Sequence, residues 1–94
     1  MRTIKYTTQF KRDYKREKKG GRHSKVIDKE LLKVTRWLAL DKRLAKRYCD
    51  HALAADWKDH RACHIKPDLI LIYRKPNDTA LELVRLGSHS QLGL

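Results

Sequence analysis

The period of the apolar residues changes from a strand pattern to a helix pattern early in the chain. Alternation of polar and apolar residues over Arg2–Thr7 predicts a half-buried strand. A helix follows, for which Thr8 is a candidate cap, and Gly20-Gly21 mark its expected end. Phe10 and Tyr14 are the main apolar residues of this helix, and basic residues cover most of its remaining surface.

A second helix is predicted by a longer apolar stripe. Ser24 is a candidate N-cap, and Asp41 marks the expected end. The stripe is shorter than the three to four heptads typical of a zipper, so we expect it to pack in the core against a sheet. Its apolar residues, widened by Trp37 and Leu40, are Ile27, Leu31, Val34 and Leu38.

Three strand signals occupy the C-terminal part of the chain. They cover His60–Lys66, Leu69–Lys75 and Thr79–Gly87, with short turns at 66–68 and 76–78. Short turns predict an antiparallel meander. The middle strand is apolar on both faces, which is typical of a central strand covered on each side.

The segment 42–56 shows no period and is predicted to be a loop. Long loops in small domains are often functional. With 94 residues the chain is expected to form one domain over 1–94. The predicted class is α+β, with an N-terminal strand and two helices packed on an antiparallel sheet of about four strands.

Positive charge dominates the composition and indicates a polyanionic partner. The net charge is +12, from 23 Lys and Arg against 11 Asp and Glu. Nucleic acid or the ribosome fits this charge, while a solubilising surface or an acidic protein partner is the alternative. The residues predicted to contact ribosomal RNA are Lys11, Arg12, Lys15, Arg16, Lys18, Lys19, Lys42, Arg43, Lys46 and Arg47.

No disulfide, metal site or membrane segment is expected. The apolar runs are too short to span a bilayer, and the N-terminus lacks the apolar core of a signal peptide, which predicts a cytosolic protein. Cys49 and Cys63 are therefore expected to be free thiols. His60 and His64 would lie about 13 Å apart on a strand, too far to share one metal ion.

The residues around the three strands include those that ribonucleases use. Cleavage of RNA requires removal of a proton from a ribose 2′-hydroxyl, protonation of the leaving oxygen and stabilisation of a charged phosphorane. Histidines and carboxylates transfer protons, and a fixed cation stabilises the charge. The chain provides His64, Asp68, Arg85 and His89 for these tasks.

The two turns predict how these residues meet. The first turn sets His64 beside Ile70, and the second sets Ile70 beside Val84 and Asp68 beside Leu86, within about one residue. On this register the four candidate residues gather at one end of the meander. A slip of one residue would turn a side chain to the opposite face.

Sequence motifs in the same region resemble those of the YafQ branch of the RelE toxin family. The resemblance is dense from about Asp50 to Leu92, and the residues that carry it are Trp57–Tyr73 and Arg85–His89. It is looser in the N-terminal part, where the matching opening consists of Tyr6, Thr7, Phe10, Lys11 and Asp13. Taken together, it extends over nearly the whole chain.

The resemblance implies a microbial-RNase-like fold and the toxin of a bacterial toxin–antitoxin pair that cuts messenger RNA in the ribosomal A site without a metal. It also implies site residues. The loop histidine of the family corresponds to His51, the strand histidine to His64 and the carboxylate after proline to Asp68. The phosphate-binding arginine corresponds to Arg85 and the C-terminal histidine to His89.

Three positions depart from the family pattern. Ala55 replaces a glycine in the loop, Leu69 stands where tryptophan is frequent, and Gly93 stands where an aromatic residue is common. Stacking on a base contributes about 1–3 kcal/mol where it occurs. Codon preference or affinity is therefore expected to differ from that of relatives with the aromatic residues.

These observations lead to one main hypothesis and two alternatives. In the main hypothesis His89 is the general acid, His64 or Asp68 accepts the 2′ proton or orients the nucleotide, Arg85 holds the phosphate, and His51 assists. The expected partners are messenger RNA on the ribosome, ribosomal RNA and an antitoxin. The alternatives are a non-enzymatic, gyrase-inhibiting toxin like the ParE relatives, and a plain RNA- or antitoxin-binding module.

Overall fold

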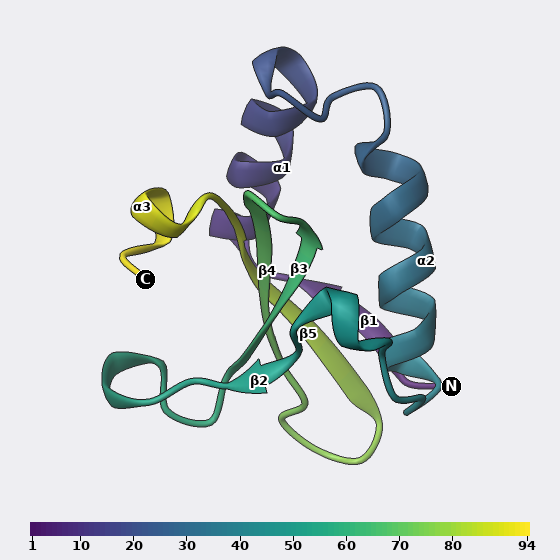
Figure 1. Ribbon diagram of the computed structural model, residues 1–94. Helices are drawn as coiled ribbons and strands as arrows, with labels where there is room; N and C mark the ends of the chain where they lie inside the picture. Colours follow the sequence, from purple (N-terminus) through teal and green to yellow (C-terminus); the bar gives the residue numbers. More distant parts are fainter.

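In the computed structural model, which describes residues 1–94, a five-stranded sheet forms the centre of the protein (Figure 1). The strand order is β1-β5-β4-β3-β2, so β4 is the central strand, as its apolar sequence predicts. The predicted α+β class is confirmed. The strands are β1 (Thr3–Tyr6), β2 (His51–Ala52), β3 (Arg61–Lys66), β4 (Leu69–Arg74) and β5 (Ala80–Gly87).

Two features of the sheet differ from the sequence-based expectation. The fifth strand, β2, lies in the segment 42–56 that is predicted to be a loop, and two residues are too few to show a period. In addition β1 pairs with β5 in parallel, whereas the other pairs are antiparallel. Parallel pairing needs a long crossover, which the chain between β1 and β5 provides.

The helices begin at positions other than the predicted caps. Thr7, not Thr8, caps α1, because its Oγ1 accepts the Phe10 N–H at 2.9 Å. Ser24 lies in a series of turns, and α2 begins after Val26 without a side-chain cap. None of the helices has the length and apolar character that crossing a membrane requires. The helices are α1 (Thr8–Gly20), α2 (Ile27–Ala39) and α3 (His89–Leu92), with single 3-10 turns η1 (Lys46–Tyr48) and η2 (Ala55–Trp57).

Apolar side chains cover both faces of β4. On one face the predicted stripe of α2 is buried against the sheet, and on the other a smaller cluster surrounds Leu92 of α3. Trp37 and Leu40 do not widen the buried stripe, since each is 43% exposed. Trp37 lies beyond the face that meets the sheet, and the Lys42 ammonium sits 5.3 Å from its ring centre.

The register of the meander is confirmed on one side of β4 and wrong on the other. His64 pairs with Ile70 as predicted. Ile70 pairs with Gly87 rather than Val84, and Leu86 lies opposite Leu71 rather than Asp68. The connection between β4 and β5 is longer than a tight turn, and a bulge between Ile72 and Tyr73 shifts the pairing further.

Candidate active site

Two histidines meet on the sheet face that is turned away from α2. The observed register places His64, Ile70 and Gly87 in one row across three strands. The chain turns after Gly87, and His89, the first residue of α3, folds back over that row. The two imidazole rings lie edge to face, with centroids 5.3 Å apart. Sequence positions 64 and 89 are thus brought into contact.

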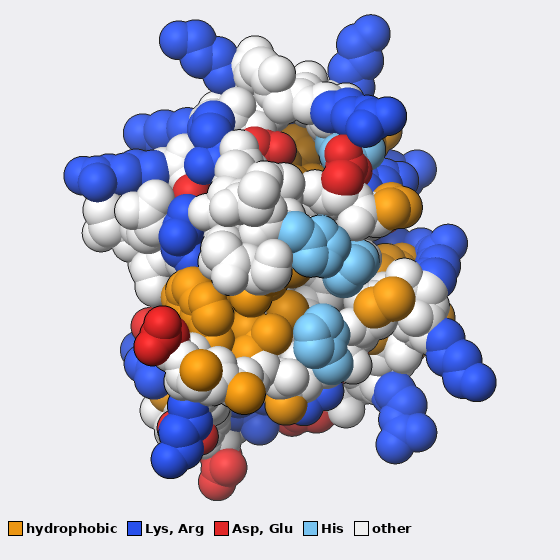
Figure 2. All heavy atoms as spheres, turned by 60° about the vertical axis from the view of Figure 1, so that its left-hand side comes forward, with side chains coloured by type: hydrophobic (Ala, Val, Ile, Leu, Met, Phe, Trp, Pro, Cys, Tyr) orange, Lys and Arg blue, Asp and Glu red, His pale blue; other side chains and the backbone are white.

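The two imidazoles have different surroundings. Burial lowers the pKa of His64 below the ordinary histidine value, and the nearby His89 and His51 lower it further. His89 itself is exposed. His64 is therefore neutral at pH 7 and able to accept a proton. Figure 2 shows the histidine side chains together on one face, beside an apolar area and surrounded by Lys and Arg.

The short helix α3 holds His89 in place through its own caps. Ser88 Oγ accepts the Gln91 N–H at 3.2 Å, and Gln91 Oε1 accepts the Ser88 N–H at 2.8 Å. Leu92 is buried in the apolar cluster beneath. Gly93 ends the helix with φ of 70°, in the left-handed region that favours glycine, so this departure from the family pattern has a structural role.

His51 is held by the backbone and by an anchored neighbour. Its Nδ1 lies 2.6 Å from the Cys49 carbonyl oxygen, which can only accept, so Nδ1 carries a proton. The Asp50 carboxylate accepts the hydroxyl of the buried Tyr73 at 2.6 Å and the Arg61 Nε–H at 3.3 Å. Burial and the Asp50 hydrogen bond raise the pKa of Tyr73, so its hydroxyl remains a donor.

Arg85 does not point freely into the site, because a buried carboxylate engages it. Its Nε donates to Asp13 Oδ2 at 2.7 Å and its Nη2 to Asp13 Oδ1 at 3.3 Å. Asp13 is fully buried, whereas the Arg85 side chain is 23% exposed. Nη1 makes no hydrogen bond within the protein and is left to bind an anion. The cation is thus held in one orientation.

Helix α1 takes the place of a neighbouring strand along the C-terminal half of β5. Beyond the end of β1, the Leu86 N–H donates to Asp13 Oδ2 at 3.0 Å. The Leu86 carbonyl accepts Arg16 Nη2 at 2.9 Å, and Arg16 Nη1 donates to Asp13 Oδ1 at 3.1 Å. Burial by itself raises the pKa of Asp13, but the hydrogen bonds from Arg85 and Leu86 outweigh it, and the pKa lies below its ordinary value.

Asp68 contacts the connection between α1 and α2 rather than the histidine pair with which it was predicted to gather. Its Oδ1 lies 2.6 Å from His23 Nε2, and its Oδ2 accepts Arg22 Nη1 at 3.3 Å. Both partners belong to the connection between α1 and α2. A polar cleft of about 380 Å³ lies between this connection, Asp68 and residues Ser88 and Gln91 of α3. Asp68 therefore borders the site through this cleft.

The predicted RNA-binding residues are all exposed and fall into three groups. Arg12, Lys19, Arg43 and Lys46 point to no partner within the protein. Four are engaged: Arg16 at the β5 edge, Lys18 with Asp28 at 2.6 Å, Arg47 over the Tyr48 ring at 4.8 Å, and Lys42 over Trp37. Lys11 and Lys15 border a separate groove.

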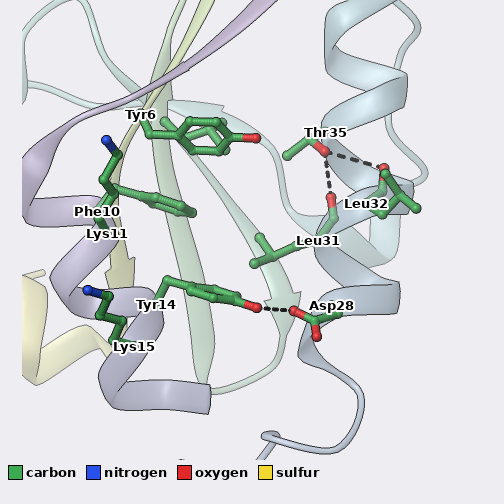
Figure 3. Close-up of a pocket in the computed structure, with 10 residues that line it drawn as sticks. Tyr6, Phe10, Lys11, Tyr14, Lys15, Asp28, Leu31, Leu32 and Thr35 are labelled. Carbon is green, nitrogen blue, oxygen red and sulfur yellow. Dashed lines mark hydrogen bonds between the residues drawn. The ribbon is translucent and has the colours of Figure 1, made fainter. Parts of the chain in front are cut away.

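That groove, of about 470 Å³, opens between α1 and α2 and is mainly apolar (Figure 3). Tyr6 and Tyr14 line it from β1 and α1, and Leu32 from α2. Tyr6 is 51% exposed and Leu32 60%. Asp28 is the acidic residue of the groove, and its carboxylate accepts the hydroxyl of Tyr14. Apolar side chains this exposed are typical of a surface that binds another protein.

Sequence reasoning missed two residues of this arrangement. Asp13 follows Phe10 by three positions and so lies on the buried face of α1, where a charge needs a partner. That spacing is a signal that could have identified it. His23 lies in turns between the helices, and nothing in its local sequence indicates contact with Asp68.

Comparisons with known proteins agree over the whole chain. The family described as "Bacterial toxin of type II toxin-antitoxin system, YafQ" matches residues 2–93. The mRNA interferase toxin YafQ of Escherichia coli strain B/BL21-DE3 is 39% identical in an alignment 94 positions long that covers 98% of this chain and 96% of the relative. The crystal structure of YafQ from strain BL21(DE3) superposes with a TM-score of 0.83 at 34% identity, covering 98% of each chain. The E. coli DinJ-YafQ complex superposes with a TM-score of 0.82 at 35% identity, again covering 98% of each chain.

The Asp13→Asn substitution tests the junction between α1 and β5. We expect it to lower the free energy of unfolding by about 3 kcal/mol at pH 7, because it leaves the Arg85 charge partly buried without its partner. The pKa of Asp13 is lower in the folded state, so its stabilisation is present above about pH 4 and is lost as pH falls through the folded value. Urea unfolding at pH 7 and pH 3 measures both effects.

Glu17→Gln is the matched control, since it removes only the charge that faces the neighbouring Arg16, whose side chain is 41% exposed. We expect it to cost less than about 1 kcal/mol. Equal losses in the two variants at pH 7, or a difference that persists unchanged at pH 3, would contradict this assignment.

Proposed function

Because this chain belongs to the YafQ family of toxins from type II toxin–antitoxin systems, we propose that it cleaves messenger RNA in the A site of the ribosome. The family and the enzyme class predicted from the sequence are confirmed: the chain is a toxin of the mRNA interferase kind, an endoribonuclease. The ribosomal A site as the place of cleavage is the proposal.

The contact between His64 and His89 is the observation that carries the proposed mechanism. His64, neutral at pH 7, removes the proton from a ribose 2′-hydroxyl, which attacks the adjacent phosphorus. The bond from phosphorus to the 5′-oxygen breaks, and His89 protonates that oxygen. The products are a 2′,3′-cyclic phosphate and a 5′-hydroxyl end.

The remaining predicted residues have supporting roles in this proposal. Arg85 offers its free Nη1 to a phosphate oxygen, and the Asp13 pair fixes its direction before substrate binds. His51, close enough to lower the pKa of His64, assists from β2. Asp68 orients the nucleotide from the polar cleft. These groups provide proton transfer and charge stabilisation, so we expect no metal requirement.

Binding to the ribosome is assigned to the exposed cations. Arg12 and Lys19 on α1, and Arg43 and Lys46 before and in η1, are not engaged within the protein. Such residues neutralise RNA phosphates and release counterions.

Action on translating ribosomes also implies a cytoplasmic location, as the sequence predicts.

The second partner is an antitoxin. A DinJ–YafQ complex is known for the E. coli relative. In this chain the groove between α1 and α2 offers exposed apolar side chains, and Lys11 and Lys15 border it. We propose that an acidic, amphipathic segment of the antitoxin occupies this groove, because its apolar face fits the floor and its carboxylates fit the lysines.

The His89→Ala substitution tests the mechanism. We expect cleavage of messenger RNA on programmed ribosomes to fall at least 100-fold, since general acid catalysis contributes about 10²–10⁴-fold. Ribosome binding remains. Mapping of 5′ ends and cosedimentation with ribosomes measure the two quantities. His60→Ala, which removes a histidine outside the site, serves as the control and retains cleavage. Full activity of His89→Ala would overturn the role of His89.

The exposed cations are tested by salt dependence. Each phosphate contact contributes roughly 0.7–0.9 to the slope of log affinity against log salt concentration. We therefore expect the double substitution Arg43→Gln and Lys46→Gln to reduce the slope for ribosome binding by about 1.5. Lys25→Gln removes an exposed cation outside the predicted set and should leave the slope unchanged. Equal slopes for the wild type and the double variant would exclude these contacts.

The groove is tested by the Leu32→Glu substitution. A carboxylate among the apolar side chains would repel an acidic segment, so we expect affinity for the antitoxin to fall at least tenfold in calorimetric titration. Leu40→Glu places the same charge on an exposed residue outside the groove and should have little effect. Equal effects of the two substitutions would argue against the groove.

A further inference from the structure

The connection between α1 and α2 holds His23 in a defined position beside Asp68. The His23 carbonyl accepts the N–H groups of Val26 and Ile27, each at 3.0 Å, so His23 belongs to the turns that lead into α2. Gly21 passes so close to α1 that a Cβ there would lie 2.5 Å from the Glu17 carbonyl oxygen. This close approach requires glycine, and it fixes where the connection leaves α1.

His23 makes the shortest contact to Asp68. The distance from Nε2 to Oδ1 is 2.6 Å, and the His23 side chain is only 21% exposed. The other partner, Arg22, is 3.3 Å away and 82% exposed, so solvent weakens its interaction. Of the other charged groups in the cleft, Arg16 is bound to Asp13 and to the β5 edge, and Glu17 to Arg16.

The contact also stabilises the ionised form of Asp68. The His23 hydrogen bond is the main cause that lowers the pKa of Asp68, and it acts against a partial burial that would raise it. An aspartate is a carboxylate at pH 7 in any case, so the effect of His23 is to fix where that carboxylate lies.

The cleft in front of Asp68 leads to α3, the helix that begins with His89. No apolar side chain lines it, and Ser88 and Gln91 form its wall on the side of α3, next to His89. A polar cleft of this kind suits the hydroxyl and amino groups of a nucleotide rather than a stacked base. A carboxylate at its border accepts hydrogen bonds from such groups.

We propose that His23 is a positioning residue for RNA cleavage, holding the Asp68 carboxylate at the border of this cleft, where it orients the nucleotide beside the bond that is cut. The inference rests on the proposed function. It extends the functional site to the connection between α1 and α2, where none of the predicted catalytic residues lies.

Two variants separate this role from a merely structural one. His23→Ala removes the hydrogen-bond donor to Asp68, whereas His23→Gln keeps an N–H donor. His60→Gln is the control, because His60 contacts Trp57 and the Lys58 carbonyl and lies away from Asp68. Thermal unfolding shows which variants are folded, and His23→Gln carries the test if His23→Ala does not fold.

The first measurement is the titration of the Asp68 side-chain carboxyl by carbon-13 NMR, which does not depend on activity. In His23→Ala the pKa of Asp68 should rise toward its ordinary value of about 3.9. The second is cleavage on programmed ribosomes. The kcat of His23→Ala should fall about tenfold, because small displacements of a positioning group cost one to two powers of ten. His23→Gln should recover most of kcat, and His60→Gln should match the wild type.

The outcomes separate the two proposals. An unchanged Asp68 pKa in His23→Ala, or cleavage by His23→Ala at the wild-type rate, overturns the role of His23 and leaves the proposed function standing. A His23→Gln variant as slow as His23→Ala, although folded, also overturns it. A wild-type protein that cuts no RNA overturns the proposed function, and the carboxyl titration then decides the pairing by itself.

Discussion

The buried carboxylate of Asp13 joins the first helix to the open edge of the sheet, and the site follows from that junction. Where β1 ends, Asp13 and Arg16 satisfy the N–H and carbonyl of Leu86 that a further strand would otherwise bind. The same carboxylate orients Arg85. At Gly87, where β5 ends, a Cβ would lie 2.8 Å from Gln91 Oε1 and 3.0 Å from Arg16 Nη2, so a larger residue would displace the ends of these two side chains. The Asp13 junction therefore orients Arg85 and lies beside the place where the chain turns into α3, the helix that begins with His89.

Chemical asymmetry follows from this architecture. His64 projects from β3, beyond the two residues that pair with β2, and is half-buried, whereas His89 is the exposed first residue of α3. Burial favours the neutral form of the first imidazole, and the second lies exposed beside it. In the proposed mechanism this difference in position makes one histidine the base and the other the acid. The pair of histidines needs only two elements of the fold: β3, which carries His64, and the short helix α3, which begins with His89.

The elements of the fold were predictable because their signals are local. The apolar stripe of α2 and the two-sided apolar strand β4 follow from residue spacing, and the tight turn at Pro67 sets His64 beside Ile70. The pairing of β4 with β5 was not predictable, because a longer connection and a bulge change the register without a sequence signal. The partners of Arg85 and Asp68 come from segments about 72 and 45 residues away, and such contacts depend on how the helices pack. The resemblance predicts the site residues, but only the structure shows which carboxylate or cation each one faces.

The chemical identity of the RNA ends produced by the wild-type protein on programmed ribosomes tests the central claim most directly. Attack by a 2′-hydroxyl, with one histidine as base and the other as acid, leaves a 5′-hydroxyl on the downstream fragment and a 2′,3′-cyclic phosphate on the upstream fragment. We expect the downstream fragments to accept a labelled phosphate from polynucleotide kinase without prior phosphatase treatment. Fragments that carry a 5′-phosphate and a 3′-hydroxyl, as attack by water on the phosphate would leave, would contradict the account.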